Sequence, residues 1–417
     1  MLSKIFMQVF FLILVFSIVL TQNQSGSIFW GQNCARCHNV RGFNEFNDAQ
    51  WDVIVRHMRI IGNLPGDQAR AILKFLQDAN NPPEEGDAIE ESVKDYVNKR
   101  VESFELFPSS KFFVSGYGVS QFVSVKEEVP SFETSFTPLF HLAIGNNTYF
   151  MVEPEFELED TKVAIELEIA QVSYFVNDYL TLVAGKFILP FNVYSERLHP
   201  TWIDKLPRRP LIYTNLLDHA LSDVGIQLRG GASLPFSEGS KINYAFYIVN
   251  GPRLEMGELM IGENFTDVDT NKTIGGRLGI LPVWNLEIGA SYMSGKASDE
   301  EGTRKEDFSM IGFDGEYHFG GLEFRGEFIR LERKFGGWKE TKNGFYVQAS
   351  YRFSGEGFLG NLEPVIRYGS VSHEEEKITQ LAFGIDYWLA PSSAIKLAYE
   401  SNKNIPNRLT LQLVIGL

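Results

Sequence analysis

The chain has 417 residues, a formal net charge of -15, 44% hydrophobic and 13% aromatic residues, and two cysteines. It is too long for one small domain, and its acidic balance argues against nucleic acid as a partner. Its 34 phenylalanines, 16 tyrosines and 37 glycines are typical of β-structure with many turns and exclude an intrinsically disordered chain.

Residues 1–21 predict a signal peptide. Lys4 precedes an uncharged apolar run from Ile5 to Leu20, and a polar stretch begins at Thr21. The run is somewhat short for a membrane span, so an uncleaved anchor is the weaker alternative. We therefore expect the chain to be exported.

Both cysteines lie in one short motif, Cys34-Ala35-Arg36-Cys37-His38. The C-x-x-C-H spacing is the attachment pattern of a c-type haem, in which two thiols one helical turn apart bond the haem and the adjacent imidazole binds the iron. We predict one covalent haem c on Cys34 and Cys37, with His38 as the proximal iron ligand. A redox thiol pair, half of a zinc site and a disulfide are the alternatives, and zinc is disfavoured because the sequence has no further cysteine.

The motif falls in a predicted small helical domain, residues 22–80. One expected helix carries Trp51, Val55 and Met58 on one face, and a second begins at Asp67 after a Leu-Pro-Gly break. The pattern Trp51-x-x-x-Val55-x-x-Met58, followed by an Ala-Ile-Leu-x-Phe-Leu helix, resembles small mono-haem cytochrome c domains. That resemblance implies a haem-binding domain in which the C-x-x-C-H motif anchors the cofactor.

The second axial iron ligand has two candidates. Met58 is the first, because a buried thioether ligand raises the potential of an electron-transfer haem, and a plain core methionine is the alternative. His57 is the second candidate. On a helix its side chain points off the Trp51/Met58 face, so we expect an exposed histidine there.

Residues 81–109 predict a linker that contains a short amphipathic helix. The run Asn81-Pro82-Pro83-Glu84-Glu85-Gly86 indicates an irregular connection, and an apolar stripe from Ile89 to Phe104 follows it. Such a stripe would dock on the haem domain, plug the next domain or pair with copies of itself.

From residue 110 to residue 417 the hydrophobic period changes to two. Phe345, Val347 and Phe353 alternate with Tyr346 and Gln348, and the last ten residues repeat the pattern. We predict sixteen strands, which start near residues 111, 135, 148, 163, 179, 223, 241, 273, 285, 307, 321, 342, 361, 378, 394 and 408. An even strand number is expected of a bacterial outer-membrane barrel.

The expected inward faces of these strands carry repeated charge, as at Glu166, Glu168, Asp314 and Glu316. A dry sandwich core would not tolerate that density of unpaired charge, whereas a wet lumen does. We therefore predict a mainly β chain: a sixteen-stranded antiparallel transmembrane β-barrel, residues 110–417, preceded by a small all-α cytochrome c domain. A soluble all-β fold is the alternative.

Connections between the predicted strands alternate in length. Short turns such as 145–147, 177–178 and 320–321 fall at every second position, and longer connections such as 187–222 and 251–272 mostly fill the others. Outer-membrane barrels have short periplasmic turns and long extracellular loops. Both barrel ends then lie on the short-turn side, which places the haem domain in the periplasm.

The barrel region resembles porins of the phosphate-selective O/P type. The likeness rests on the Gly-Lys-Phe-x-x-Pro-Phe strand end at residues 185–191 and on the strands at 362–368 and 383–387. It implies a diffusion channel whose third long loop folds inward as the constriction. Candidate constriction cations are Arg197, Lys205, Arg208 and Arg209. The alternative is that they pair with Glu196, Asp204 and Asp218 or simply face water. Phosphate selectivity is not carried over because many lumen positions are acidic.

Together the two halves predict an outer-membrane porin with a periplasmic c-type haem, in which electron transfer is coupled to the pore or its partners. The alternative is a passive anion or nutrient diffusion porin whose haem domain is an anchor or redox gate. Expected partners are periplasmic electron carriers, small anionic or nutrient solutes, outer-membrane lipid and two further copies in a homotrimer. We find no catalytic constellation in the sequence and do not expect an enzyme.

Overall fold

The computed structural model describes residues 25–81, 110–159, 162–217, 221–235, 237, 239–255, 257–261, 270–299, 304–355, 357–374 and 376–417. The predicted signal peptide lies outside the described residues. So does the predicted linker helix, because only Asn81 of residues 81–109 is described.

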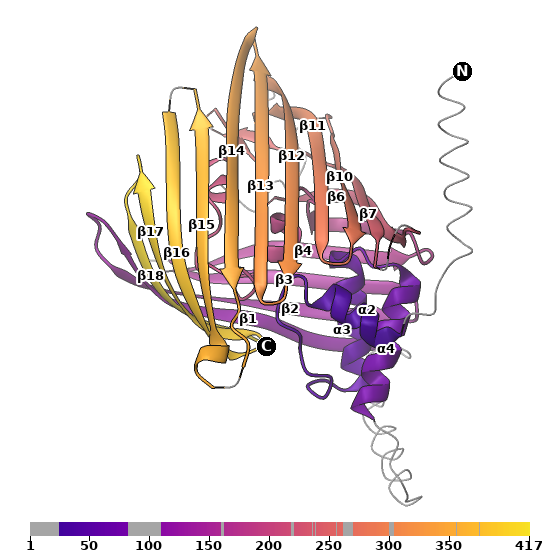
Figure 1. Cartoon of the computed structure of the whole chain (residues 1–417). Helices are drawn as coiled ribbons and strands as arrows, with labels where there is room; N and C mark the ends of the chain where they lie inside the picture. Colours follow the sequence, from indigo (N-terminus) through magenta and orange to yellow (C-terminus); the bar gives the residue numbers. More distant parts are fainter. Residues whose placement is uncertain are drawn as a thin grey trace, which may run out of the picture.

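Sixteen strands of the described residues close into an antiparallel barrel (Figure 1), in which β1 pairs with both β2 and β18 and β7 pairs with β10. They are β1 (Ser110–Val125), β2 (Ser131–Ile144), β3 (Thr148–Glu159), β4 (Lys162–Phe175), β5 (Thr181–Ile188), β6 (Ser222–Ser233), β7 (Lys241–Val249), β10 (Thr273–Val283), β11 (Leu286–Ser298), β12 (Lys305–Phe319), β13 (Leu322–Phe335), β14 (Trp338–Tyr351), β15 (Leu362–His373), β16 (Glu376–Ala390), β17 (Ser393–Lys403) and β18 (Arg408–Gly416). A small hairpin, β8 (Arg253–Glu255) and β9 (Glu258–Met260), lies between β7 and β10. Every barrel strand begins within four residues of its predicted start, so the predicted fold class is confirmed.

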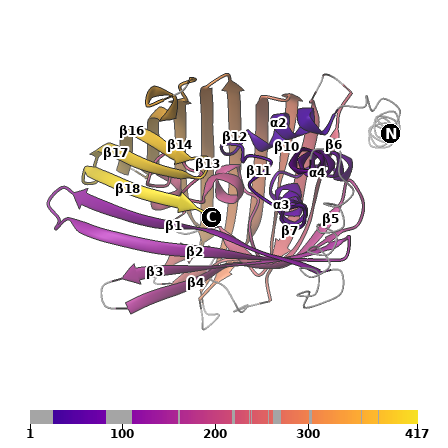
Figure 2. The ribbon, with the colours of Figure 1, turned by 90° about the horizontal axis from the view of Figure 1, so that it is seen from below.

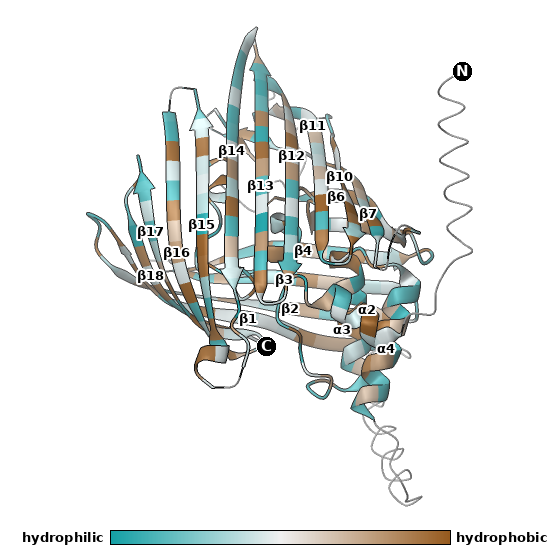
Figure 3. Cartoon of the chain, viewed as in Figure 1, coloured by the Kyte–Doolittle hydropathy of each residue, from teal (hydrophilic) through white to brown (hydrophobic). Residues whose placement is uncertain are grey.

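Apolar side chains cover the outside of the barrel. On β14, Phe345 and Val347 are 38% and 54% exposed, whereas Tyr346 and Gln348 are buried. Alternation along β18 is the same, with leucines outward and Thr410 inward. Figure 3 shows the resulting bands of hydrophobic residues along the strands. An apolar outer face with a polar lining is the arrangement of a barrel that spans a membrane.

The connections follow the predicted alternation only in part. One end has the short turns 145–147 and 320–321, and the other has the long connections 189–221 and 250–272. At the long-loop end, however, β13 and β14 are joined by Gly336 and Gly337 alone, both with positive φ. Glycine has no Cβ to clash at positive φ, so this pair permits a tight hairpin where a long loop was expected.

Three helices precede the barrel: α2 (Gly26–Cys34), α3 (Asp48–Ile61) and α4 (Gly66–Asn80). Asn47 caps α3 in a complete capping box with Gln50, which satisfies two of the free N–H groups at the helix start. Trp51, Ile72 and Leu76 form the centre of their shared core. No helix among the described residues has the length and apolar character needed to cross a membrane.

The helices dock at the barrel end that carries most of the short turns (Figures 1 and 2). The Gly66 N–H donates to the carbonyl of Asp178 at 2.7 Å, and the Arg59 guanidinium donates to the carbonyl of Asn177 at 2.6 Å. Arg56 similarly reaches the carbonyl of Asn146. The helical region lies on the expected side, and it contacts the barrel directly.

The third long connection folds into the lumen, as predicted. It contains a π-helical turn, η2 (Tyr194–Leu198), and a short helix, α6 (Ile212–Asn215). A separate 3-10 turn, η3 (Leu359–Asn361), lies in the connection between β14 and β15. We call residues 189–217 the lumen loop. Its apolar side chains, including Leu189, Phe191 and Ile212, are buried in one core with inward residues of the strands. The loop is therefore a packed part of the barrel interior.

Candidate functional site

The C-x-x-C-H motif lies where α2 ends, and its residues face a cavity. Cys34 closes the helix, and Cys37 and His38 follow in the next turn. All three line a cavity with about 1450 Å³ of space free of protein atoms, part of it open to solvent. His57 and Met58 of α3 line the same cavity. The structure thus brings together every predicted haem-binding residue.

Three separate parts of the chain form the walls of this cavity. The helical region contributes Phe46 and Ile54, the strands contribute Phe113 and Leu139, and the lumen loop contributes Trp202. The His38 ring lies 5.0 Å from the Trp202 ring, centroid to centroid. The cavity is therefore inside the barrel mouth, between the helices and the lumen loop. The sequence predicted a haem domain next to the barrel and missed this enclosure.

The protonation of the thiols argues against a redox pair. Burial raises the pKa of Cys34 to about 12 and also raises the pKa of Cys37, which lies near Glu316 as well. Reactive thiols need a lowered pKa, since the thiolate is the nucleophile. Both cysteines are free. The raised pKa values differ from the lowered pKa that is typical of a reactive thiol pair.

His38 is oriented as an iron ligand would be. Its Nδ1 lies 2.8 Å from the carbonyl oxygen of Asn39, so Nδ1–H donates and Nε2 carries the lone pair. Burial lowers the pKa of His38, which keeps the ring neutral. Two thiols, a neutral imidazole and largely apolar walls are the donor set and surroundings of a c-type haem, so the residues fit that group.

His57 is partly buried, which corrects the expectation of an exposed histidine. The barrel wall packs over α3, and the resulting burial lowers the pKa of His57 to about 4. His57 Nδ1 lies 3.3 Å from the Tyr149 hydroxyl, which lies 2.6 Å from His141 Nδ1. His141 Nε2 in turn lies 2.8 Å from Ser115. Sequence reasoning missed this polar chain because its members come from three different strands and a helix.

Arg36, inside the motif, joins the helical region to the barrel. Its guanidinium is buried and donates to Glu316 on β12 at 2.8 Å and to Glu287 on β11. Glu287 also accepts from Arg197 of the lumen loop at 2.9 Å and from Arg277 of β10 at 3.0 Å. One buried ion-pair network thus connects the motif, the loop and the wall.

The four predicted constriction cations are all paired, and their partners are carboxylates of the barrel wall. The pairs are Arg197 with Glu287 at 2.9 Å, Lys205 with Glu363 at 3.1 Å, Arg208 with Glu400 at 3.3 Å and Arg209 with Glu168 at 3.8 Å. Glu196 and Asp204, the partners suggested from sequence, instead contact Arg229 and Tyr194, and Asp218 lies outside the described residues. The cations fasten the lumen loop to the wall.

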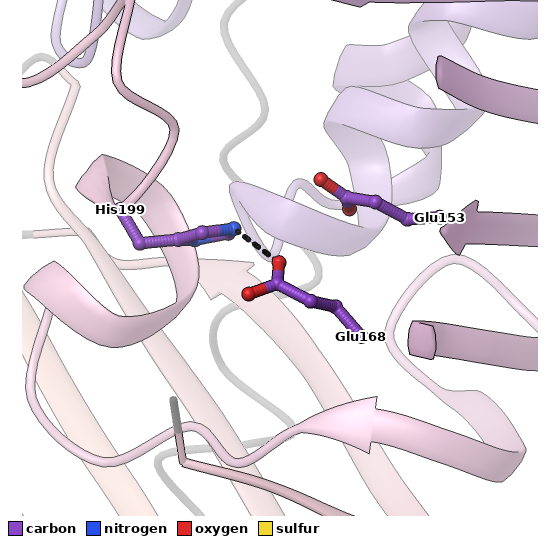
Figure 4. Close-up of side chains that lie close together, drawn as sticks. All are labelled: Glu153, Glu168 and His199. Carbon is purple, nitrogen blue, oxygen red and sulfur yellow. Dashed lines mark ion pairs between the residues drawn. The ribbon is translucent and has the colours of Figure 1, made fainter. Parts of the chain in front are cut away.

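A second cluster lies beside the cavity. Glu153 of β3, Glu168 of β4 and His199 of the lumen loop converge in the interior (Figure 4). Their ligand atoms all lie within 4.8 Å of one another, and His199 Nε2 is 3.7 Å from Glu168 Oε2. Sequence reasoning noted Glu168 only as a lumen charge and did not consider His199.

Comparison with known proteins identifies the fold. No protein-family model and no curated protein sequence matches the chain. Among solved structures, the anion-selective porin of Comamonas acidovorans is similar with a TM-score of 0.54 and 13% identity, over 74% of this chain and 100% of that one. The trimer form of OmpT from Vibrio cholerae has a TM-score of 0.53 and 11% identity over the same shares. The outer-membrane channel DcaP of Acinetobacter baumannii has a TM-score of 0.52 and 11% identity, over 75% and 99%. The barrel has the porin fold.

Proposed function

We propose that the chain is a bacterial outer-membrane porin-type barrel that holds one covalent haem c in its periplasmic mouth and transfers electrons there. The observation that carries the proposal is the shared cavity: Cys34, Cys37 and His38 face it together with Met58 and His57. Similarity to the porins supports the barrel half alone. The haem half is supported by the donor set and its enclosure.

In this proposal the chain's own residues attach, orient and shield the cofactor. The two thiols would hold it, and His38 together with Met58 or His57 would bind its iron. When bound, the haem supplies one-electron transfer between ferrous and ferric iron. Trp202 and Leu139 contribute to a largely apolar lining, which favours a raised potential.

The position of the cavity defines the partners. It lies at the end that carries most of the short turns, so periplasmic electron carriers would approach from the helical side. A soluble acceptor or partner would approach through the lumen from the opposite end. Outer-membrane lipid would surround the apolar outer face, and a homotrimer agrees with the trimer form recorded for OmpT of Vibrio cholerae.

A second candidate function is passive diffusion of small anions or nutrients, with the haem region as an anchor or redox gate. The observation that favours it is the network through Glu287, which ties the motif and the lumen loop to one wall carboxylate. A change of charge at the motif would then reach the loop directly.

The first test is a haem-stained gel of outer-membrane fractions, run with unheated and boiled samples. The expected result is covalent haem on a band whose mobility changes on boiling, as for other closed barrels. Haem on a band that does not shift would refute the barrel location, and a shifting band without haem would refute the haem.

The two candidate functions are separated by conductance in planar bilayers at oxidising and reducing potentials. Electron transfer predicts reduction by periplasmic carriers with a pore conductance that does not depend on redox state. A redox gate predicts a conductance that changes when the haem is reduced.

A further inference from the structure

Glu153, Glu168 and His199 form an enclosed group between two hollows of the lumen. Glu153 and His199 line the cavity of the C-x-x-C-H motif, and Glu168 and His199 line a second, polar hollow. The three residues are 2%, 2% and 8% exposed. Two come from neighbouring wall strands and the third from the lumen loop, so the group exists only when loop and wall are assembled (Figure 4).

Several polar atoms of this group make no hydrogen bond, although His199 Nε2 faces Glu168 Oε2 at 3.7 Å and Arg209 lies 3.8 Å from Glu168 Oε1. Within the described parts of the chain, Glu153 Oε1, Glu168 Oε2 and both ring nitrogens of His199 make no hydrogen bond. Buried polar atoms are normally satisfied by a hydrogen bond, and an unsatisfied one destabilises the fold. Three residues whose ligand atoms lie within 4.8 Å of one another can together bind a cation.

An irregularity in the sheet turns Glu168 into this position. Glu153 pairs with Ile169, but the next residue, Pro154, pairs with Leu167, which leaves Glu168 as the extra residue of β4. Such a bulge re-aims a side chain, and proline, which has no N–H, is tolerated there. As a result the consecutive residues Glu168 and Ile169 are both buried, although a regular strand would turn one of them outward.

The local charge also favours a cation. Glu153, Glu155 and Glu168 converge here, and Arg209, 3.8 Å from Glu168, is the one nearby base paired with this group among the described residues. The three carboxyl groups outnumber the one guanidinium. Buried carboxylates without a compensating cation are costly, and a divalent cation would neutralise them.

We propose that Glu153, Glu168 and His199 bind a divalent first-row transition-metal ion that joins the lumen loop to strands β3 and β4. One imidazole and two carboxylates suit ions such as Mn²⁺, Co²⁺ and Zn²⁺. Two metal–ligand bonds of about 2.1 Å span at most about 4.2 Å, so the farthest pair of ligand atoms closes by roughly half an ångström on binding. The site is independent of the haem proposal, because it uses none of the haem-binding residues.

The test uses the full chain in detergent, stripped with EDTA and titrated with Zn²⁺ by calorimetry. We expect one Zn²⁺ per chain, and at least tenfold weaker binding in Glu168→Gln and in His199→Ala. Glu166→Gln is the matched control, since it removes the same charge from the same strand at an exposed lumen position, and its affinity should equal that of the wild type. X-ray absorption at the zinc edge should show nitrogen and oxygen ligands, including one imidazole.

Three results would overturn the site: no Zn²⁺ binding, equal affinity in Glu168→Gln and His199→Ala and in the wild type, or sulfur ligands at the zinc edge. Sulfur would place the ion on Cys34 and Cys37. Folding of each variant is checked by its heat-modifiable mobility, and Glu153→Gln replaces any variant that fails this check.

Discussion

The guanidinium of Arg36 donates to the carboxylate of Glu316 at 2.8 Å, which bonds the middle of the C-x-x-C-H motif to strand β12. The two residues are 280 positions apart in the sequence, and both are buried. Arg36 therefore fixes the motif to the barrel. It lies between the two cysteines and is not one of the residues predicted to bind the haem.

Arg36→Ala should loosen the helical region from the barrel. It removes one cation from Glu287 and Glu316 in a buried setting, where loss of one partner costs about 3 kcal/mol. We expect a lower thermal unfolding temperature for the helices. Arg70→Ala is the control: it also breaks a pair between helix and barrel turn, with Asp178, but Arg70 is exposed and the loss should stay below about 1 kcal/mol. Equal shifts in the two variants would contradict the role of Arg36.

Met58→Ala should remove the second axial ligand of a bound haem. Met58 and His57 both line the cavity, and the sequence pattern favours Met58 as the ligand. We expect the absorption and electron paramagnetic resonance spectra of Met58→Ala to change from low spin to high spin and its potential to fall, since a thioether ligand raises the potential. His57→Ala should remain low spin. If His57→Ala gave high-spin spectra and Met58→Ala kept the low-spin spectra of the wild type, the ligand would be His57.

The barrel was predictable because each strand is marked by an alternation of residue types within its own sequence. Alternation such as Phe345/Tyr346 identifies a strand and both of its faces without knowledge of its neighbours. Two irregularities of the barrel also have causes within a few residues. The Gly336-Gly337 pair permits a tight hairpin where a long loop was expected. Pro154 on β3 lies at the register shift that produces the bulge on β4.

The enclosure of the site was not predictable, because it depends on contacts between distant segments. Nothing in the sequence around Arg36 indicates that its side chain is buried. Only the fold shows that it contacts Glu287 and Glu316. His199 likewise gains its neighbours Glu153 and Glu168 when the lumen loop folds inward. Sequence spacing predicts chemistry within one element, such as the motif itself, and cannot predict which wall residues will face it.

Acid should weaken the docking of α3 on the barrel through Asp52. Burial raises the pKa of Asp52, but hydrogen bonds from Arg56 and Lys111 outweigh burial and leave the pKa below its ordinary 3.8. A lowered folded-state pKa means that the stabilisation from these charged hydrogen bonds is complete above pH 3.8 and is lost as pH falls through the folded value.

The measurement is the thermal unfolding temperature of wild type and Asp52→Asn at neutral pH and below pH 3.8. Asp52→Asn should be less stable at neutral pH and should lose less on acidification than the wild type. Asp78→Asn, which alters an exposed pair with Lys74 on α4, serves as the control and should follow the wild type at both pH values. A wild-type acid loss that persists in full in Asp52→Asn would contradict the assignment.

Arg208→Ala should make the pore more selective for cations. Arg208 pairs with Glu400 at 3.3 Å and is partly exposed, so its removal leaves a wall carboxylate without its cation beside the lumen loop. The lumen then carries one positive charge less, which should raise the cation-to-anion permeability ratio. Reversal potentials in planar bilayers under a salt gradient measure this ratio. Lys126→Ala, in the turn between β1 and β2, is the control and should leave it unchanged, because Lys126 is exposed beside Glu127. An unchanged ratio in Arg208→Ala would mean that the ion path does not pass this part of the lumen loop.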